Sequence, residues 1–175
     1  MKKLLLLFTL AITFSCCNND DDNPQTLPPA TQTGAGTFAC YVNGKPFIDS
    51  SGGYFNCFYQ FIDGEYYFGI KGKDKIGQLV SISLGTIKKT ISEGEILTLL
   101  EMQDGNASGG GGFLLNINSS ESATTNQIQS GQLTITKLDF VNSIVSGTFY
   151  MDLINPYTNE IVEIRDGRFD TLFTQ

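Results

Sequence analysis

Short segments in which apolar residues occupy every second position recur from about residue 37 to the C-terminus. In the first of them Phe38, Cys40 and Val42 fall on one face. A period of two is typical of β-strands that bury one side, and Gly, Asn and Asp turn residues separate the segments. The pattern therefore predicts roughly nine or ten short strands.

Strands of this kind, joined by short turns, predict an all-β fold. We expect an antiparallel β-sandwich, with a partly open β-barrel as the alternative. Asn43-Gly44 predicts a hairpin turn because both residues tolerate positive φ. Residues 91–102 are ambiguous: Ser92 and Glu95 fit a helix capping box, but Gly94 interrupts a helix. We favour a strand there.

A glycine-rich segment covers residues 103–112 and ends in four successive glycines. Such a run could cradle a phosphate, but no Gly-Lys-Ser/Thr follows it and no helix is predicted to begin there. We expect a flexible loop tip.

The N-terminus has the organisation of a secretion signal. Met1-Lys2-Lys3 is basic, residues 4–12 are almost wholly apolar, and Ser15 precedes Cys16. This order resembles the lipobox of bacterial lipoproteins, in which the cysteine carries the lipid. We expect a signal peptide over 1–15 and lipidation (diacylglycerol with palmitate-type acyl chains) at Cys16. Cys17 is the rival, but a cysteine instead of a small serine would then precede the cut.

Residues 16–36 are polar and contain three of the five prolines. Such a composition predicts a flexible acidic tether, followed by a single β domain over 37–175. The run Asp20-Asp21-Asp22 behind the lipidated cysteine resembles the signal that exports Bacteroidetes lipoproteins to the outer face of the outer membrane. We therefore expect a lipid-anchored outer-membrane protein exposed at the cell surface.

Charge and composition exclude several classes of function. The chain has 11 basic and 18 acidic residues, a net charge of −7, and no histidine. Loss of the signal removes Lys2 and Lys3, leaving nine basic against 18 acidic residues, or −9. An acidic protein does not suit nucleic-acid binding. Without histidine, Ser-His-Asp and Cys-His catalysis and His-ligated metal sites are excluded.

Two cysteines remain in the domain, Cys40 and Cys57, each on the apolar face of a predicted strand. An exported protein meets an oxidising compartment, so a disulfide between them is one interpretation. Two buried thiols acting as small apolar side chains are the other.

Six carboxylates crowd the last third of the chain. They are Asp139, Asp152, Glu160, Glu163, Asp166 and Asp170. A glycoside hydrolase needs two acids about 5 to 9 Å apart, but we expect these residues in turns or on outward faces, paired with Arg165 and Arg168. We predict no catalytic residue, metal or cofactor. Weak calcium binding by Asp166 and Asp170, or by Asp104-Gly105-Asn106, is the alternative.

Five aromatic residues are predicted to lie away from the core face or in a loop: Tyr41, Phe58, Tyr67, Tyr150 and Tyr157. If they cluster, their rings could form a platform on which a sugar or another ligand stacks.

Residues 37–47 form one familiar stretch, and 131–139, 144–149 and 166–170 form another. Together they resemble a group of Bacteroidetes lipoproteins classed only as a domain of unknown function. The resemblance implies an exported, β-rich domain, and it brings no catalytic or ligand residues.

These observations favour a non-catalytic surface module that binds a glycan or a protein, rather than an enzyme. Two alternatives stay open. One is a structural envelope protein without a small ligand, and the other is a carboxylate-based carbohydrate hydrolase.

Overall fold

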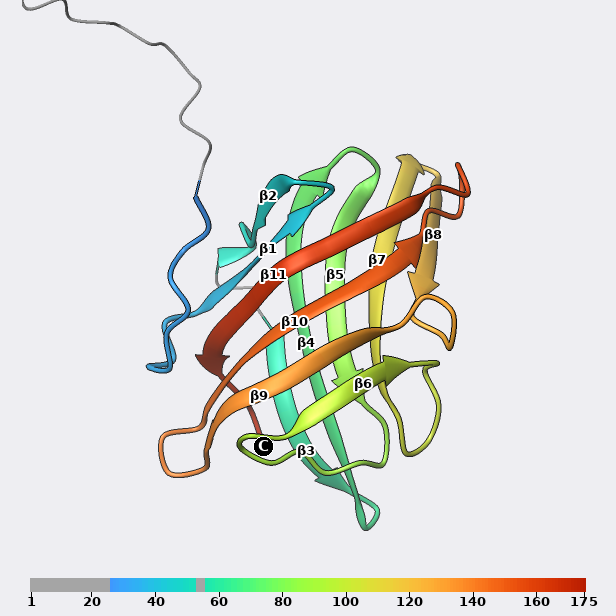
Figure 1. Cartoon of the computed structure of the whole chain (residues 1–175). Coiled ribbons are helices and arrows are strands. Elements are labelled where there is room, and N and C mark those ends of the chain that lie inside the picture. Colours follow the sequence, from blue (N-terminus) through green and yellow to red (C-terminus); the bar gives the residue numbers. More distant parts are fainter. Residues whose placement is uncertain (1–25, 53–55) are drawn as a thin grey trace, which may run out of the picture.

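A computed structural model describes residues 26–52 and 56–175, and their strands form one strongly curled mixed sheet (Figure 1). The strands are β1 (Thr37–Val42), β2 (Lys45–Ile48), β3 (Asn56–Ile62), β4 (Glu65–Ile76), β5 (Leu79–Thr86), β6 (Ile96–Leu100), β7 (Ala107–Asn116), β8 (Ser119–Thr124), β9 (Gly131–Asp139), β10 (Ile144–Ile154) and β11 (Ile161–Leu172). No α-helix occurs in this described part of the chain. The predicted all-β class is confirmed.

The sheet folds back on itself into two layers. Its strand order is β2-β1-β11-β10-β9-β6-β7-β5-β4-β3, with β8 paired to β7. All pairs are antiparallel except β6 with β7. Figure 1 shows β6, β9, β10 and β11 crossing in front of β3, β4, β5 and β7, so the apolar faces of the two groups enclose the core.

Hydrogen bonds partly close the gap between the two ends of the sheet. After β11, Thr174 accepts from the Tyr59 amide at 2.9 Å and donates its own amide to the Cys57 carbonyl at 3.0 Å. After β2, the Ser50 amide donates to the Lys73 carbonyl at 2.8 Å. The fold therefore lies between the two predicted alternatives. It is a two-layered sheet whose open side is partly joined by hydrogen bonds, as in a partly open barrel.

Aromatic rings from both layers fill the centre of the core. Phe38 on β1 packs against Phe149 on β10 with ring centroids 5.2 Å apart, and Phe68 on β4 packs against Phe169 on β11 at 6.2 Å. Phe38, Phe68 and Phe169 are fully buried. The Phe68–Phe169 pair joins β4 and β11 from opposite layers, so it helps to hold the curled sheet together.

The expectation of a flexible loop at the glycine run is wrong. The four glycines at 109–112 lie within β7, paired with β5 and β8. A Cβ atom on Gly111 would lie 2.8 Å from both Leu153 and Leu79, so the missing side chain lets the opposite layer approach. From the sequence alone a run of glycines predicts a loop, because the sequence does not show that side chains of other strands occupy the space beside each glycine.

The ambiguous segment at 91–102 contains a strand, β6, as favoured. The Ser92 amide does donate to the Glu95 carboxylate, at 2.9 Å. That contact closes a turn before β6 instead of starting a helix.

The last part of the predicted tether is fixed to the domain. Thr31, Thr33, Gly34 and Ala35 all donate hydrogen bonds to the carboxylate of Asp170 on β11. Asp170 is 1% exposed, so its expected place in a turn or on an outward face is wrong. Burial by itself raises the pKa of this carboxyl, but these hydrogen bonds together hold the pKa well below its usual range.

Candidate functional site

A β-bulge in β11 shapes the outer face of the front layer. Phe149 pairs with Gly167 and Met151 pairs with Ile164, so Arg165 and Asp166 together face one residue of β10. Asp166 has a φ of 51°. Asp166 is exposed, as expected for an outward-facing acid, and it lies in a bulge inside a continuous strand that uses the left-handed conformation also found in turns.

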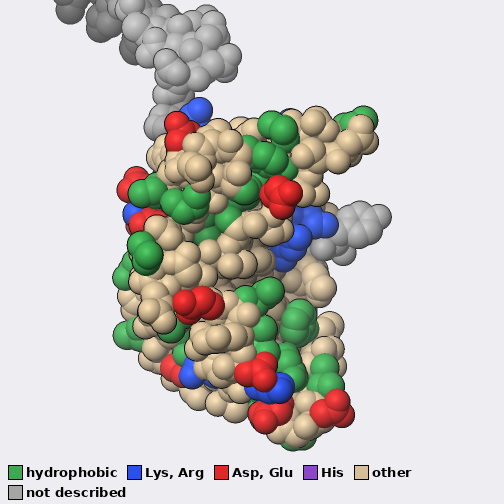
Figure 2. Space-filling model, turned by 90° about the vertical axis from the view of Figure 1, so that its right-hand side faces the viewer, with side chains coloured by type: hydrophobic (Ala, Val, Ile, Leu, Met, Phe, Trp, Pro, Cys, Tyr) green, Lys and Arg blue, Asp and Glu red, His purple; other side chains and the backbone are tan. Residues whose placement is uncertain are grey.

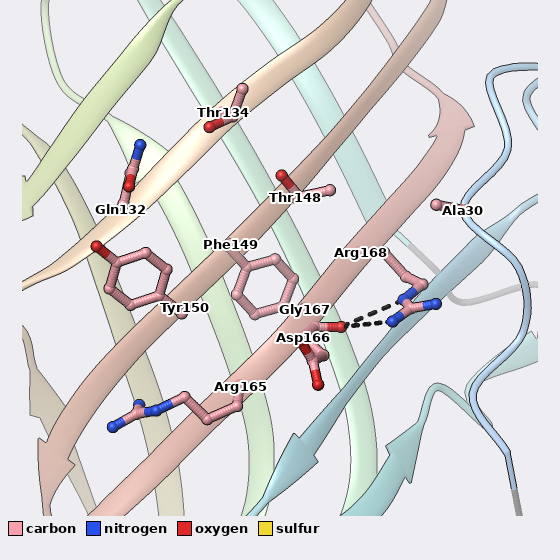
Figure 3. A pocket seen from close by; sticks show the side chains of 10 residues that line it. All are labelled: Ala30, Gln132, Thr134, Thr148, Phe149, Tyr150, Arg165, Asp166, Gly167 and Arg168. Atoms are coloured by element: carbon pink, nitrogen blue, oxygen red, sulfur yellow. Dashed lines mark hydrogen bonds between the residues drawn. The ribbon is translucent and has the colours of Figure 1, made fainter.

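Outward-facing side chains beside this bulge form two rungs across β9, β10 and β11. In the first rung, Thr134, Thr148 and Arg168 are direct cross-strand partners. In the second, Gln132 pairs with Tyr150, which faces the bulge. The two rungs surround a surface pocket of about 460 Å³ (Figure 3). We call it the Tyr150 pocket.

Tyr150 supplies an aromatic surface in this pocket. Its side chain is 49% exposed. Figure 3 shows its ring lying along the sheet beside Gln132, with a face turned outward. Exposed tyrosine offers both an apolar ring for stacking and a hydroxyl for hydrogen bonding.

Neutral polar groups surround the ring. The side chains of Gln132, Thr134 and Thr148 make no hydrogen bond to any residue that the structure describes, and neither does the Tyr150 hydroxyl. Together they present several hydrogen-bond donors and acceptors, held in register on neighbouring strands of the sheet. Such a surface can bind a ligand that carries many hydroxyl groups.

The two arginines beside the pocket differ in their partners. Arg165 Nη1 lies 2.6 Å from Asp152 and Nη2 lies 3.3 Å from Glu163, two acids that face each other across β10 and β11. Its charge is therefore neutralised. The predicted acidic partner is confirmed for Arg165.

Arg168 is held by backbone carbonyl groups. Its Nε and Nη2 donate to the Asp166 carbonyl at 3.2 and 3.1 Å, and Nη1 donates to the Pro28 carbonyl at 3.3 Å. No carboxylate of the described residues lies within ion-pair distance, so the predicted acidic partner is wrong here. Arg168 therefore adds a positive group and fixes the N-terminal segment at the edge of the pocket.

The five predicted aromatic residues do not form one platform. Tyr150 lies in the pocket on the front layer, whereas Phe58 and Tyr67 line a groove on the back layer. Tyr41 is on β1, and Tyr157 follows β10 with its hydroxyl 3.4 Å from Ser119. The sequence did not identify Gln132, Thr134 and Thr148 as pocket residues. They are polar residues that point away from the core, and many positions in the chain share that property.

Cys40 and Cys57 are both buried free thiols, on β1 and β3. These strands are not neighbours in the sheet. Burial, with a smaller contribution from the Asp74 carboxylate, raises the pKa of Cys40 to about 12, and burial raises the pKa of Cys57 as well. Cys16, the predicted lipidation site, lies outside the described residues.

Acidic side chains are few in the surface pockets. Among the pockets of the described residues, the Tyr150 pocket is lined by one carboxylate (Asp166), the back groove by none, and another pocket near β2 by Glu160 alone. Within residues 26–52 and 56–175, no group of three or more His, Cys, Asp or Glu residues is placed to hold a metal. The paired acids of a glycoside hydrolase are thus absent from these pockets.

No family model, curated protein or solved structure matches the chain. In the part of the chain that the structure describes, no helix has the length and apolar character needed to cross a membrane.

Proposed function

We propose that the protein is a lipid-anchored surface module that binds a glycan in the Tyr150 pocket. The observation that carries the proposal is the exposed Tyr150 ring, set in register beside unpaired hydroxyl and amide groups on the two adjacent strands β9 and β10. The activity is binding, because no described pocket brings two carboxylates together for hydrolysis.

The chemistry of a sugar ring suits this surface. A pyranose has an apolar C–H face that can stack on an aromatic ring, and hydroxyl groups around its edge. Tyr150 would take the face, while Gln132, Thr134 and Thr148 would hydrogen-bond the edge. The pocket volume of about 460 Å³ lies within the usual range for small-molecule sites.

The predicted lipid anchor fits the position of the pocket. Arg168 holds Pro28, and Ala30 lines the pocket, so the segment leading back to Cys16 starts at its edge. A chain of twelve residues, from Cys16 to Pro28, spans at most about 40 Å. A glycan bound in the pocket would therefore stay close to the outer membrane. Replacing Cys16 by serine should move the protein from the membrane fraction to the soluble fraction.

The binding proposal is tested by thermal unfolding of the purified protein with a panel of neutral and acidic oligosaccharides. A glycan present at about 100 times its Kd should stabilise the fold by about 2.7 kcal/mol and raise the unfolding midpoint. Tyr150→Ala should abolish the shift. Tyr67→Ala, a half-buried tyrosine on the opposite layer, is the matched control and should retain it.

A flat response to the whole panel would contradict glycan binding and favour the structural alternative. A shift that survives Tyr150→Ala but is lost in Tyr67→Ala would place the ligand on the other layer.

A further inference from the structure

The outer face of the back layer carries a second depression, a groove of about 440 Å³ over β3, β4, β5 and β7. It lies on the opposite layer from the Tyr150 pocket. We call it the Ser108 groove. It does not depend on the glycan proposal.

Small residues form the floor of this groove. Gly69 on β4, Ser83 and Gly85 on β5, and Ser108 and Gly110 on β7 occupy adjacent outward positions in register. Because the side chains on β5 and β7 are short, a ligand could lie close to the backbone of these two strands.

Aromatic and aliphatic side chains form the walls. The distal end of the Phe58 ring covers Gly69, since a Cβ atom there would lie 2.5 Å from two ring carbons. The ring therefore leans across the sheet toward its cross-strand neighbour. Tyr67, Ile62 and Met102 continue the wall, and Ile62 and Met102 are 48% and 65% exposed.

The groove contains no charge. None of its lining residues is Asp, Glu, Lys or Arg, although the chain as a whole carries a net charge of −7. On the side of the molecule shown in Figure 2, by contrast, acidic and basic groups lie among scattered apolar ones. An uncharged lining disfavours an ionic ligand, because a charge would lose its hydration there without gaining a partner.

One hydroxyl group on the groove floor opens into the groove. Ser108 is 8% exposed and lies on the groove side of β7. Its hydroxyl makes no hydrogen bond to the described residues, whereas the neighbouring Thr86 hydroxyl donates to the Lys89 carbonyl at 2.9 Å. A hydroxyl that faces the groove and is not used by the protein can donate to or accept from a ligand, so Ser108 is the position at which a ligand oxygen would be hydrogen-bonded.

We propose that the Ser108 groove binds an uncharged, mainly apolar small molecule that contains a flat ring and a hydrogen-bonding oxygen. The ring lies on the Gly and Ser floor against Phe58, and its oxygen meets the Ser108 hydroxyl. The volume suits a small molecule, and such sites are typically apolar with few polar groups.

The test titrates the purified protein with Nile red, an uncharged planar dye with a carbonyl oxygen, and follows its fluorescence. We expect saturable binding to one site. Ser83→Leu, which fills the floor, should weaken binding at least tenfold, and Ser108→Ala should weaken it roughly two- to tenfold through the lost hydrogen bond. Ser81→Ala, a buried serine outside the groove, and Tyr150→Ala should bind as the parent does.

The anionic dye 8-anilinonaphthalene-1-sulfonate should bind at least tenfold more weakly than Nile red at this site. Circular dichroism establishes that each variant is folded; if Ser83→Leu does not fold, Phe58→Leu replaces it and should also weaken binding. Non-saturable binding, unchanged affinity in the groove variants, or tighter binding of the anionic dye would each overturn the proposal.

Discussion

The Asp170 carboxylate accepts a hydrogen bond of 2.9 Å from the backbone amide of Thr33, 137 residues earlier in the chain. The Gly34 and Ala35 amides and the Ser146 hydroxyl donate to the same carboxylate. A buried charge is tolerated when hydrogen bonds surround it in this way. The stretch from Pro28 to Ala35 is therefore fixed to the folded domain beside the Tyr150 pocket.

Asp170→Asn should destabilise the domain by about 1–3 kcal/mol, because an amide nitrogen would face backbone N–H donors that then lose their acceptor. Urea unfolding measures the loss. Asp166→Asn, an exposed acid four residues earlier, is the control and should stay within about 0.5 kcal/mol of the parent. Equal stabilities of the two variants would contradict the role of Asp170.

The same carboxylate predicts how stability depends on pH. The pKa of Asp170 in the folded state lies below that in the unfolded chain, which is about 3.9. Its stabilisation is thus fully present above the unfolded pKa and is lost as the pH falls toward the folded pKa. The difference in unfolding free energy between the parent and Asp170→Asn should shrink from pH 7 to pH 3. A constant difference would argue against this assignment.

The sequence predicted the elements with regular alternation and missed those without it. β8 has no alternation by which to predict it, because Ser-Ser-Glu-Ser-Ala-Thr contains almost nothing apolar, and the glycines of β7 predict a loop instead of a strand. Tyr150 was recognised as an outward-facing aromatic residue. Its neighbours Thr134 and Thr148 were not, because their meeting depends on the register between strands, which a single-strand pattern does not contain.

Gly131 brings β9 close to β10 beside Tyr150. A Cβ atom there would lie 2.5 Å from Met151 Cβ and 2.8 Å from Met151 Cα. Gly131→Ala should therefore destabilise the domain by about 1–3 kcal/mol and weaken glycan binding, since the two strands must separate. Gly110→Ala, where the nearest heavy atom is 3.1 Å away, should cost clearly less in the same urea experiment. The reverse order would contradict this account of the close approach.

Because Cys40 and Cys57 are buried, we expect their thiols to react slowly with thiol reagents in the folded protein. With Cys16 and Cys17 replaced by serine, the native protein should not react with a thiol reagent at neutral pH, because burial and a raised pKa keep Cys40 and Cys57 protonated and covered. Both should react after unfolding in urea. Rapid labelling of the native protein, or the absence of reactive thiols after unfolding without reductant, would contradict two buried free cysteines.

Calorimetric titration of the best glycan from the panel into the parent and three variants tests the central claim. Tyr150→Ala should lower the affinity at least tenfold, about 1.4 kcal/mol. Tyr150→Phe, which keeps the ring, should bind within about threefold of the parent, less than 1 kcal/mol, and Tyr67→Ala should bind as the parent does. Unchanged affinity in Tyr150→Ala, or a loss in Tyr67→Ala alone, would contradict glycan binding in the Tyr150 pocket.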